Sequence, residues 1–168
     1  MKIRKAVLTD ALGIARVQVD SWKTTYKNVI PDKFLDQMTH ESREQKWKDI
    51  IFKENVFIAE NKDGEVVGFS NGGKERTGKY PSYEGELYAI YILKEYQRQG
   101  IGKLLLIPII EELKRQNIFS MMVLVLEENS SRLFYESLKA ERIDTTVIEV
   151  AGKKLNELIY GWDDIRMI

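Results

Sequence analysis

The chain has 168 residues, a length typical of one domain that buries a hydrophobic core without disulfides. Its 26 basic and 26 acidic residues cancel, which disfavours a broad basic face for nucleic acid, and the lack of cysteine excludes disulfides and thiolate catalysis. One histidine cannot build a multi-histidine metal site, and no apolar run has the length of a membrane span. We therefore expect one cytoplasmic domain over residues 1–168, with no metal, membrane or nucleic acid as partner.

The first half of the chain predicts a strand, three helices and a hairpin. A loosely alternating strand precedes Thr9 and Asp10, which suit the N-cap of a helix that frays near Thr25. Asp63-Gly64 separates two β-branched runs, a strong hairpin signal. The expected ranges are a strand at 2–7, helices at 10–25, 31–37 and 40–52, strands at 56–60 and 65–70, and a glycine-rich loop at 71–83.

The second half predicts three buried elements and a closing hairpin. Residues 84–93 and 121–126 have the apolar composition of buried strands, and residues 101–116 have helical spacing. Pro108 removes a backbone donor inside that helix, so we expect a kink there. A short helix from Asn129 or Ser130 to Leu138 and a hairpin of strands 145–150 and 155–162 complete a mixed sheet with helices on both faces.

The segment Gln97-Arg98-Gln99-Gly100-Ile101-Gly102 lies between a predicted buried strand and a predicted helix. A helix N-terminus offers free backbone amides and the positive end of the helix dipole, and glycines let a phosphate approach them. The segment lacks the Gly-Lys-Ser/Thr of a nucleotide-hydrolysing loop and the glycine order of a dinucleotide fold. It therefore favours a pyrophosphate site of another kind, or a tight turn without a ligand.

These residues resemble the GCN5-related N-acetyltransferase (GNAT) family, whose hallmark matches Gln97, Gly100 and Gly102. A second family pattern, an Asn before a helix with a Phe-Tyr pair, matches Asn129 and Phe134-Tyr135, and the resemblance extends over nearly the whole chain. It implies an α/β (α+β) fold: a mixed, mostly antiparallel twisted sheet of about seven strands with helices on both faces. Lys139 replaces a glycine common in the family, so it must adopt a left-handed conformation or close its helix differently.

The resemblance implies acetyl-CoA as co-substrate and no metal. The edge of the strand around Ile90–Ile92 would pair with the pantetheine arm, and loop amides would hold the pyrophosphate. Arg98 and Lys103 either add charge or are solvated, and Asn129 either orients CoA or a water, or caps a helix. The expected cofactor-binding residues are Ile90, Tyr91, Ile92, Gln97, Arg98, Gln99, Gly100, Ile101, Gly102, Lys103, Asn129 and Tyr135.

The implied reaction is acetyl transfer to a primary amine by direct attack in a ternary complex, which needs a base and an acid. Tyr135 is the expected acid for the leaving thiolate, with a core aromatic as the alternative. Glu86 is the expected base, directly or through a water, with a carboxylate that merely attracts a cationic acceptor as the alternative. Glu84 is a weaker substitute.

The acceptor, a small-molecule or peptide amine, cannot be named from the sequence. Tyr26 and Tyr88 are speculative acceptor contacts, because aromatic faces can hold a cationic amine. His40 reads as a solvated or capping residue. A non-catalytic acyl-CoA sensor is the alternative function, a phosphate-loop nucleotide enzyme is disfavoured, and a homodimer is expected from the resemblance alone.

Overall fold

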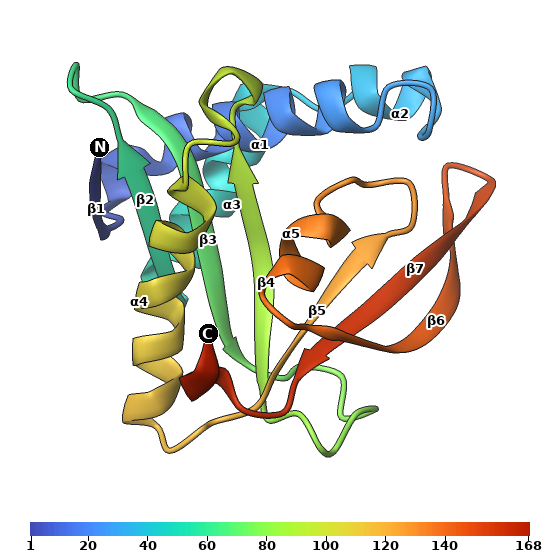
Figure 1. Ribbon diagram of the computed structural model, residues 1–168. Helices are drawn as coiled ribbons and strands as arrows, with labels where there is room; N and C mark the ends of the chain where they lie inside the picture. The colour runs from blue at the N-terminus through green and yellow to red at the C-terminus, as the bar shows by residue number, and fades with distance from the viewer.

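The computed structural model describes residues 1–168 and contains one seven-stranded sheet in the order β1-β2-β3-β4-β5-β7-β6 (Figure 1). All neighbouring strands are antiparallel except β4 and β5. This topology confirms the predicted mixed, mostly antiparallel sheet. The strands are β1 (Lys2–Lys5), β2 (Asn55–Glu60), β3 (Val66–Lys74), β4 (Gly85–Ile92), β5 (Met121–Leu126), β6 (Glu141–Val150) and β7 (Lys153–Trp162).

Helices cover both faces of the sheet, because each helix buries one apolar side. In Figure 1, α4 lies in front of the sheet and α1 and α3 lie behind it. The front core joins α4 and α5 to β5 and β7, and the rear core joins α1 and Trp47 of α3 to β2 and β3. The helices are α1 (Ala11–Thr25), α2 (Asp32–Asp36), α3 (His40–Lys53), α4 (Ile101–Arg115) and α5 (Arg132–Ser137), with short 3-10 turns at Leu8–Asp10, Lys94–Tyr96 and Ile165–Met167. No helix combines the length and apolarity that crossing a bilayer requires.

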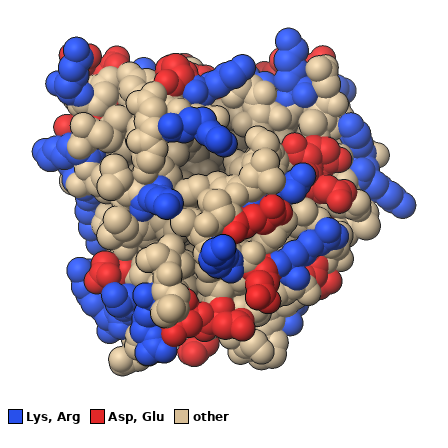
Figure 2. Space-filling view, viewed as in Figure 1, with Lys and Arg blue, Asp and Glu red and all other residues tan.

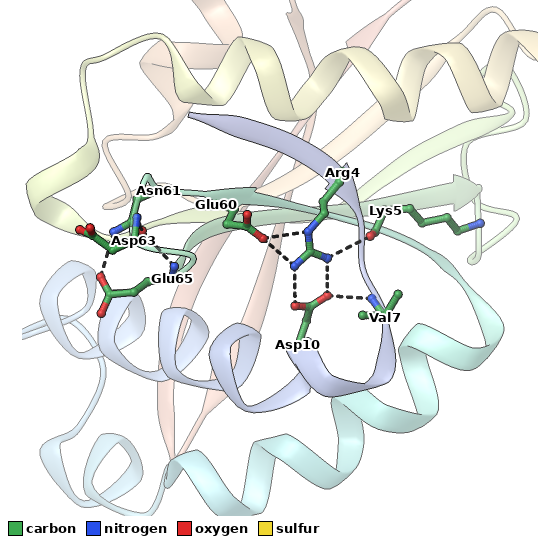
Figure 3. A network of polar contacts seen from close by, with 8 residues as sticks. All are labelled: Arg4, Lys5, Val7, Asp10, Glu60, Asn61, Asp63 and Glu65. Carbon is green, nitrogen blue, oxygen red and sulfur yellow. Dashed lines mark hydrogen bonds and ion pairs between the residues drawn. The ribbon is translucent and has the colours of Figure 1, made fainter.

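The N-terminal strand is tied to its neighbours by Arg4. Its guanidinium donates to both carboxylate oxygens of Asp10, at 2.8 and 2.9 Å, and to Glu60 of β2 at 2.9 Å. Figure 3 shows the Arg4 side chain between the two carboxylates, with the Asp10 carboxylate also accepting from the Val7 amide. Asp10 thus anchors the chain between β1 and α1, in addition to its expected place at the helix start.

Two expected strand boundaries differ from the structure. The segment 71–83 was expected to be loop, but β3 continues to Lys74, and Gly72 and Gly73 pair with Leu87 and Glu86. A Cβ on Gly72 would lie 2.8 Å from the carbonyl oxygen of Glu86 in β4 and 2.9 Å from Ile109 of α4, so this glycine permits close packing of both rather than marking a turn. The strand expected at 145–150 begins at Glu141, because β7 continues to offer it a pairing edge.

Two expected helix features can be compared directly. Pro108 lies inside α4, which continues to Arg115, so the proline does not end the helix. Lys139, just after α5, has a φ of 66°, the left-handed conformation that a glycine would adopt at no steric cost. The chain therefore adopts the left-handed conformation at this point with a residue other than glycine.

The middle of the sheet is split. β4 and β5 pair in parallel only over Gly85–Leu87 and Met121–Val123. Beyond Leu87, β4 pairs only with β3, so its backbone edge from Tyr88 to Ile92 has no strand partner toward β5. Tyr88 is the extra residue of a bulge between the Gly72–Leu87 and Asn71–Ala89 pairs. An open strand edge therefore faces a gap between the two halves of the sheet.

Candidate active site

The loop of residues 97–102 follows the open end of β4 and leads into α4. Arg98 and Gly100 have φ values of 62° and 81°, which turn the chain sharply before the helix begins at Ile101. The backbone amides of the five residues from Arg98 to Gly102 donate to no acceptor within the chain. Five neighbouring free amides at a helix N-terminus form a site for an anionic group.

Two glutamines hold this loop in place. The Gln97 amide donates to the carbonyl of Ile92 at 3.0 Å, and the Gln99 amide donates to the carbonyl of Glu95 at 3.1 Å. The Gln97 bond joins the loop to the end of β4, and the Gln99 bond joins it to the 3-10 turn at Lys94–Tyr96. Arg98 and Lys103 form no ion pair with another residue of the chain.

The two glycines of the loop have different roles. Nothing lies within 4 Å of a Cβ built on Gly100, whose positive φ suits glycine. A Cβ on Gly102 would lie 3.1 Å from the ring of Phe134, so glycine lets α5 pack closely against the first turn of α4. The face with α4 and α5 is hollowed near its centre, and lysine and arginine side chains border the hollow (Figure 2). An open strand edge, free amides and basic surroundings fit an extended amide arm that ends in a diphosphate.

Tyr135 of α5 lies in the front core. Its ring is 4% exposed and meets the ring of Trp162 edge to face, with centroids 6.0 Å apart. The hydroxyl makes no hydrogen bond within the chain, and burial raises the pKa of the phenol, with smaller effects from Tyr91 and Tyr26. A phenol is protonated at neutral pH without any such shift, and because this hydroxyl has no partner it is available as a donor.

Asn129 and Tyr26 bind each other rather than facing solvent. The Asn129 amide donates to the Tyr26 hydroxyl at 3.0 Å, and its oxygen accepts from the amide of Ser131 at 2.9 Å. Both residues are buried, and Tyr26 packs with Leu126 and other apolar residues behind the sheet. The pair joins the end of α1 to the start of α5. Asn129 thus makes a local turn contact with Ser131, the N-cap residue of α5, and Tyr26 makes a packing contact.

Glu86 is the buried carboxylate of β4, with 2% of its side chain exposed. It accepts three hydrogen bonds, all from Arg76: from the backbone amide at 3.1 Å, from Nε at 3.2 Å and from Nη2 at 2.7 Å. The guanidinium also lies 3.9 Å from the ring centroid of Tyr88, whose hydroxyl donates to the carbonyl of Lys74 at 2.6 Å. The structure thus brings Glu86 and Tyr88 together, around an arginine that sequence reasoning missed.

A second carboxylate, Glu157 of β7, was also missed. Its backbone pairs in register with Leu126 at the end of β5. Its side chain is half-buried and forms no hydrogen bond or ion pair. Burial and, to a smaller extent, the charge of Glu86 raise its pKa. No local sequence signal marks Glu157 or Arg76, because Glu157 lies on a distant strand and Arg76 lies in the loop after β3, whose path brings it to Glu86. We refer to Arg76, Glu86, Tyr88 and Glu157 as the acceptor cluster.

Other polar groups lie apart from the cleft. His40 contacts Asp20 at 2.9 Å on the helical layer behind the sheet. A polar cavity of about 430 Å³ next to α5, β6 and β7 is lined by Glu127, Arg132, Glu136, Arg142 and Tyr160, among others, and includes neither Tyr135 nor Glu86. The free amides of the 97–102 loop and the acceptor cluster therefore remain the candidate site.

Comparison with known proteins agrees with this architecture. The model of the acetyltransferase (GNAT) family matches residues 19–139. A Bacillus subtilis (strain 168) protein named uncharacterized N-acetyltransferase YuaI is 42% identical over 163 residues, which cover 97% of this chain and 93% of that protein. A spermidine N(1)-acetyltransferase of Thermoplasma acidophilum is 26% identical over 112 residues, or 63% of this chain and 66% of that protein.

Solved structures show the same fold. The PaiA N-acetyltransferase of Thermoplasma acidophilum, crystallised in complex with coenzyme A, superposes with a TM-score of 0.70 at 21% identity. The match covers 94% of this chain and 96% of that one. At this level of identity the likeness concerns the fold, and it extends over nearly the full length of both chains.

Proposed function

Because the chain belongs to the GNAT family of acetyltransferases, we propose that it moves the acetyl group of acetyl-CoA to a primary amine by direct attack in a ternary complex. One observation carries this proposal above the others. The unpaired edge of β4 leads directly to the five free amides of residues 98–102. Together they match an extended chain of amides that ends in a diphosphate, which is the form of CoA.

On this proposal, the donor binds along the front cleft. The pantetheine amides pair with the backbone of Ile90–Ile92, and the diphosphate accepts from the amides of the 97–102 loop. Gln97 holds the loop against the end of β4 through its bond to Ile92, and Arg98 and Lys103 add positive charge nearby. A backbone amide near Ile92 polarises the thioester carbonyl, as the resemblance to the family implies.

The transfer then needs a base that takes a proton from the amine and an acid that gives a proton to the thiolate. Glu86 takes a proton from the acceptor ammonium, directly or through a water, and the neutral nitrogen attacks the thioester carbonyl. The C–N bond forms, the C–S bond breaks, and the thiolate of CoA takes a proton from Tyr135. The free hydroxyl supports this role of Tyr135, since a phenol is protonated at neutral pH and this one has no partner within the chain. The attacking nitrogen loses its second proton to solvent, Glu86 releases its proton to solvent, and the Tyr135 phenolate takes one from solvent before the next turnover.

The acceptor cluster supports a positively charged acceptor. Glu157 has no partner within the chain, and the buried Glu86 lies close enough to raise its pKa. A cation near these carboxylates would relieve their repulsion. The similarity to a spermidine acetyltransferase points the same way, so we infer a small amine or a peptide amine, with polyamines first in the panel to be tested.

The experiment is a thiol-release assay of the full chain with acetyl-CoA and polyamines, amino acids, aminoglycosides and peptides with free N-termini. The proposal expects release that depends on one class of amine. A non-catalytic acyl-CoA sensor, the alternative, would bind CoA and release no thiol with any acceptor. The free hydroxyl of Tyr135 and the buried carboxylate of Glu86 favour the enzyme, because a sensor needs neither.

A further inference from the structure

The contacts of Glu86 are distributed unevenly between its two oxygens. Oε2 accepts from the backbone amide and Nε of Arg76, whereas Oε1 accepts only from Nη2. A carboxylate offers about four lone-pair positions in total. Arg76 therefore fills both positions on Oε2 and leaves about one open on Oε1. The carboxylate is held firmly without being saturated.

Arg76 is itself held from two sides. Its guanidinium lies over the ring of Tyr88 at 3.9 Å, and the Tyr88 hydroxyl is fixed by the carbonyl of Lys74. The hydrogen bond to Glu86 raises the pKa of Arg76, so the guanidinium remains charged. Yet 54% of the Arg76 side chain is exposed, against 2% for Glu86. The pair thus spans the surface of the site, with the carboxylate inside and the cation outside.

The Arg76 guanidinium stabilises the buried Glu86 carboxylate. A carboxylate taken out of water needs a compensating charge and hydrogen bonds. A planar guanidinium supplies both and fixes the orientation of the carboxylate, which an ammonium group does less well. The other charged groups that act on Arg76 or Glu157 are Glu54 at the end of α3, and Lys79 in the loop before β4.

We propose that Arg76 is a positioning residue, which orients Glu86 so that the open lone pair of Oε1 receives the proton of the acceptor amine. This inference rests on the proposed function and adds to it a residue that does not touch the reacting atoms. Misplacement of a catalytic group by about 1 Å can cost about 10²-fold in rate. We therefore expect Arg76→Ala to lower kcat by about 10- to 100-fold, with the KM for acetyl-CoA unchanged.

The chain contains a matched control. Arg166 has a similar exposure of 56%, pairs with Asp164 at 2.8 Å and lies 4.6 Å from the ring centroid of Phe119, outside the acceptor cluster. Arg166→Ala removes the same kinds of interaction and should leave kcat at the wild-type value. Arg76→Lys retains the charge without the planar fork, so its kcat should be intermediate.

Two further readouts separate positioning from a merely structural role. Guanidinium ion at millimolar concentration should raise the rate of Arg76→Ala and leave Arg166→Ala unaffected. In a Glu86→Gln background, Arg76→Ala should cause little additional loss, because both substitutions disable the same group. Thermal unfolding of each variant checks that it folds. If Arg76→Ala does not fold, Arg76→Lys is used for the test instead.

The outcomes are distinguishable. A wild-type kcat in Arg76→Ala, or in Arg76→Lys where the alanine variant does not fold, overturns the inference. An additive loss in the double variant does so too. A faster Arg76→Ala enzyme also overturns it and shows that the arginine obstructs the acceptor. If the wild-type chain transfers no acetyl group to any amine, the proposed function itself fails.

Discussion

Replacing Gly100 separates backbone strain from charge in the 97–102 loop. Gly100 has a φ of 81° with open space where a Cβ would lie, so Gly100→Ala meets no steric clash with a neighbour. Its cost is the left-handed conformation alone, about 1–2 kcal/mol, or about 5- to 30-fold in CoA affinity if binding requires this conformation. Aspartate tolerates that conformation at least as well as alanine, so any further loss in Gly100→Asp comes from its charge.

The loss of CoA affinity caused by the aspartate charge can be worked out from its distance to a bound phosphate. A carboxylate about 4 Å from a phosphate repels it by about 4 kcal/mol at an effective dielectric constant near 20, before screening by salt. We therefore expect Gly100→Asp to bind CoA about 10²- to 10³-fold more weakly than Gly100→Ala. The ligand-free stability should differ little or favour aspartate, since a negative charge at a helix N-terminus is stabilising.

Isothermal titration of the wild type and both variants with CoA measures these affinities, and thermal unfolding without ligand measures the stabilities. The control variant is Gly100→Ala, which shares the strain and lacks the charge. Equal CoA affinity in the aspartate and alanine variants would refute the reasoning, because it would mean that no phosphate lies at these amides. A parallel loss of stability and affinity in Gly100→Asp would point to misfolding of the loop instead.

Three other predictions follow from buried groups. Tyr135→Phe should lower kcat by about 10²- to 10⁴-fold, the range of general-acid catalysis, with CoA affinity by calorimetry unchanged; undiminished turnover would remove Tyr135 from the mechanism. Because the pKa of Glu157 is raised above its ordinary 4.5, its contribution to stability is present at acidic pH and is lost as pH rises through the folded-state pKa. Glu157→Gln should therefore raise the melting temperature relative to wild type more at pH 7 than at pH 4, and the opposite trend would contradict the assigned environment. Gly161→Ala should destabilise the fold by about 1–3 kcal/mol, since its Cβ would lie 2.5 and 2.6 Å from two ring carbons of Tyr83 and 2.8 Å from its hydroxyl, and should cost less in a Tyr83→Ala background.

Helix positions were predictable from the sequence because their determinants are local. The expected helix at 40–52 is observed as His40–Lys53, with the Thr39 side chain capping it by accepting from the Ser42 amide at 3.1 Å. The end of β3, residues 71–74, was predicted to be loop because glycines signal loops in general. In Gly72 the missing side chain instead makes room for Ile109 of α4, which is a tertiary contact that no local pattern reveals.

The two sides of the candidate site also differ in how far local sequence determines them. The phosphate side consists of neighbouring residues at a strand-to-helix junction, so its glycine pattern is visible in the sequence. The acceptor side is assembled from separate elements: the loop after β3 places Arg76 on Glu86, and β7 brings Glu157 near it. Glu86 and Tyr88 were expected to contribute to catalysis or acceptor binding. Their shared arginine became apparent only in the structure.

The most direct test of the central claim is the transfer reaction of the wild-type chain itself. Acetyl-CoA is incubated with the amine panel, released thiol is measured, and the products are examined by mass spectrometry. The account predicts thiol release in equal amount to an acceptor that carries one acetyl group on nitrogen. Binding of CoA in the cleft without release for any amine, or no binding of CoA at all, would contradict it.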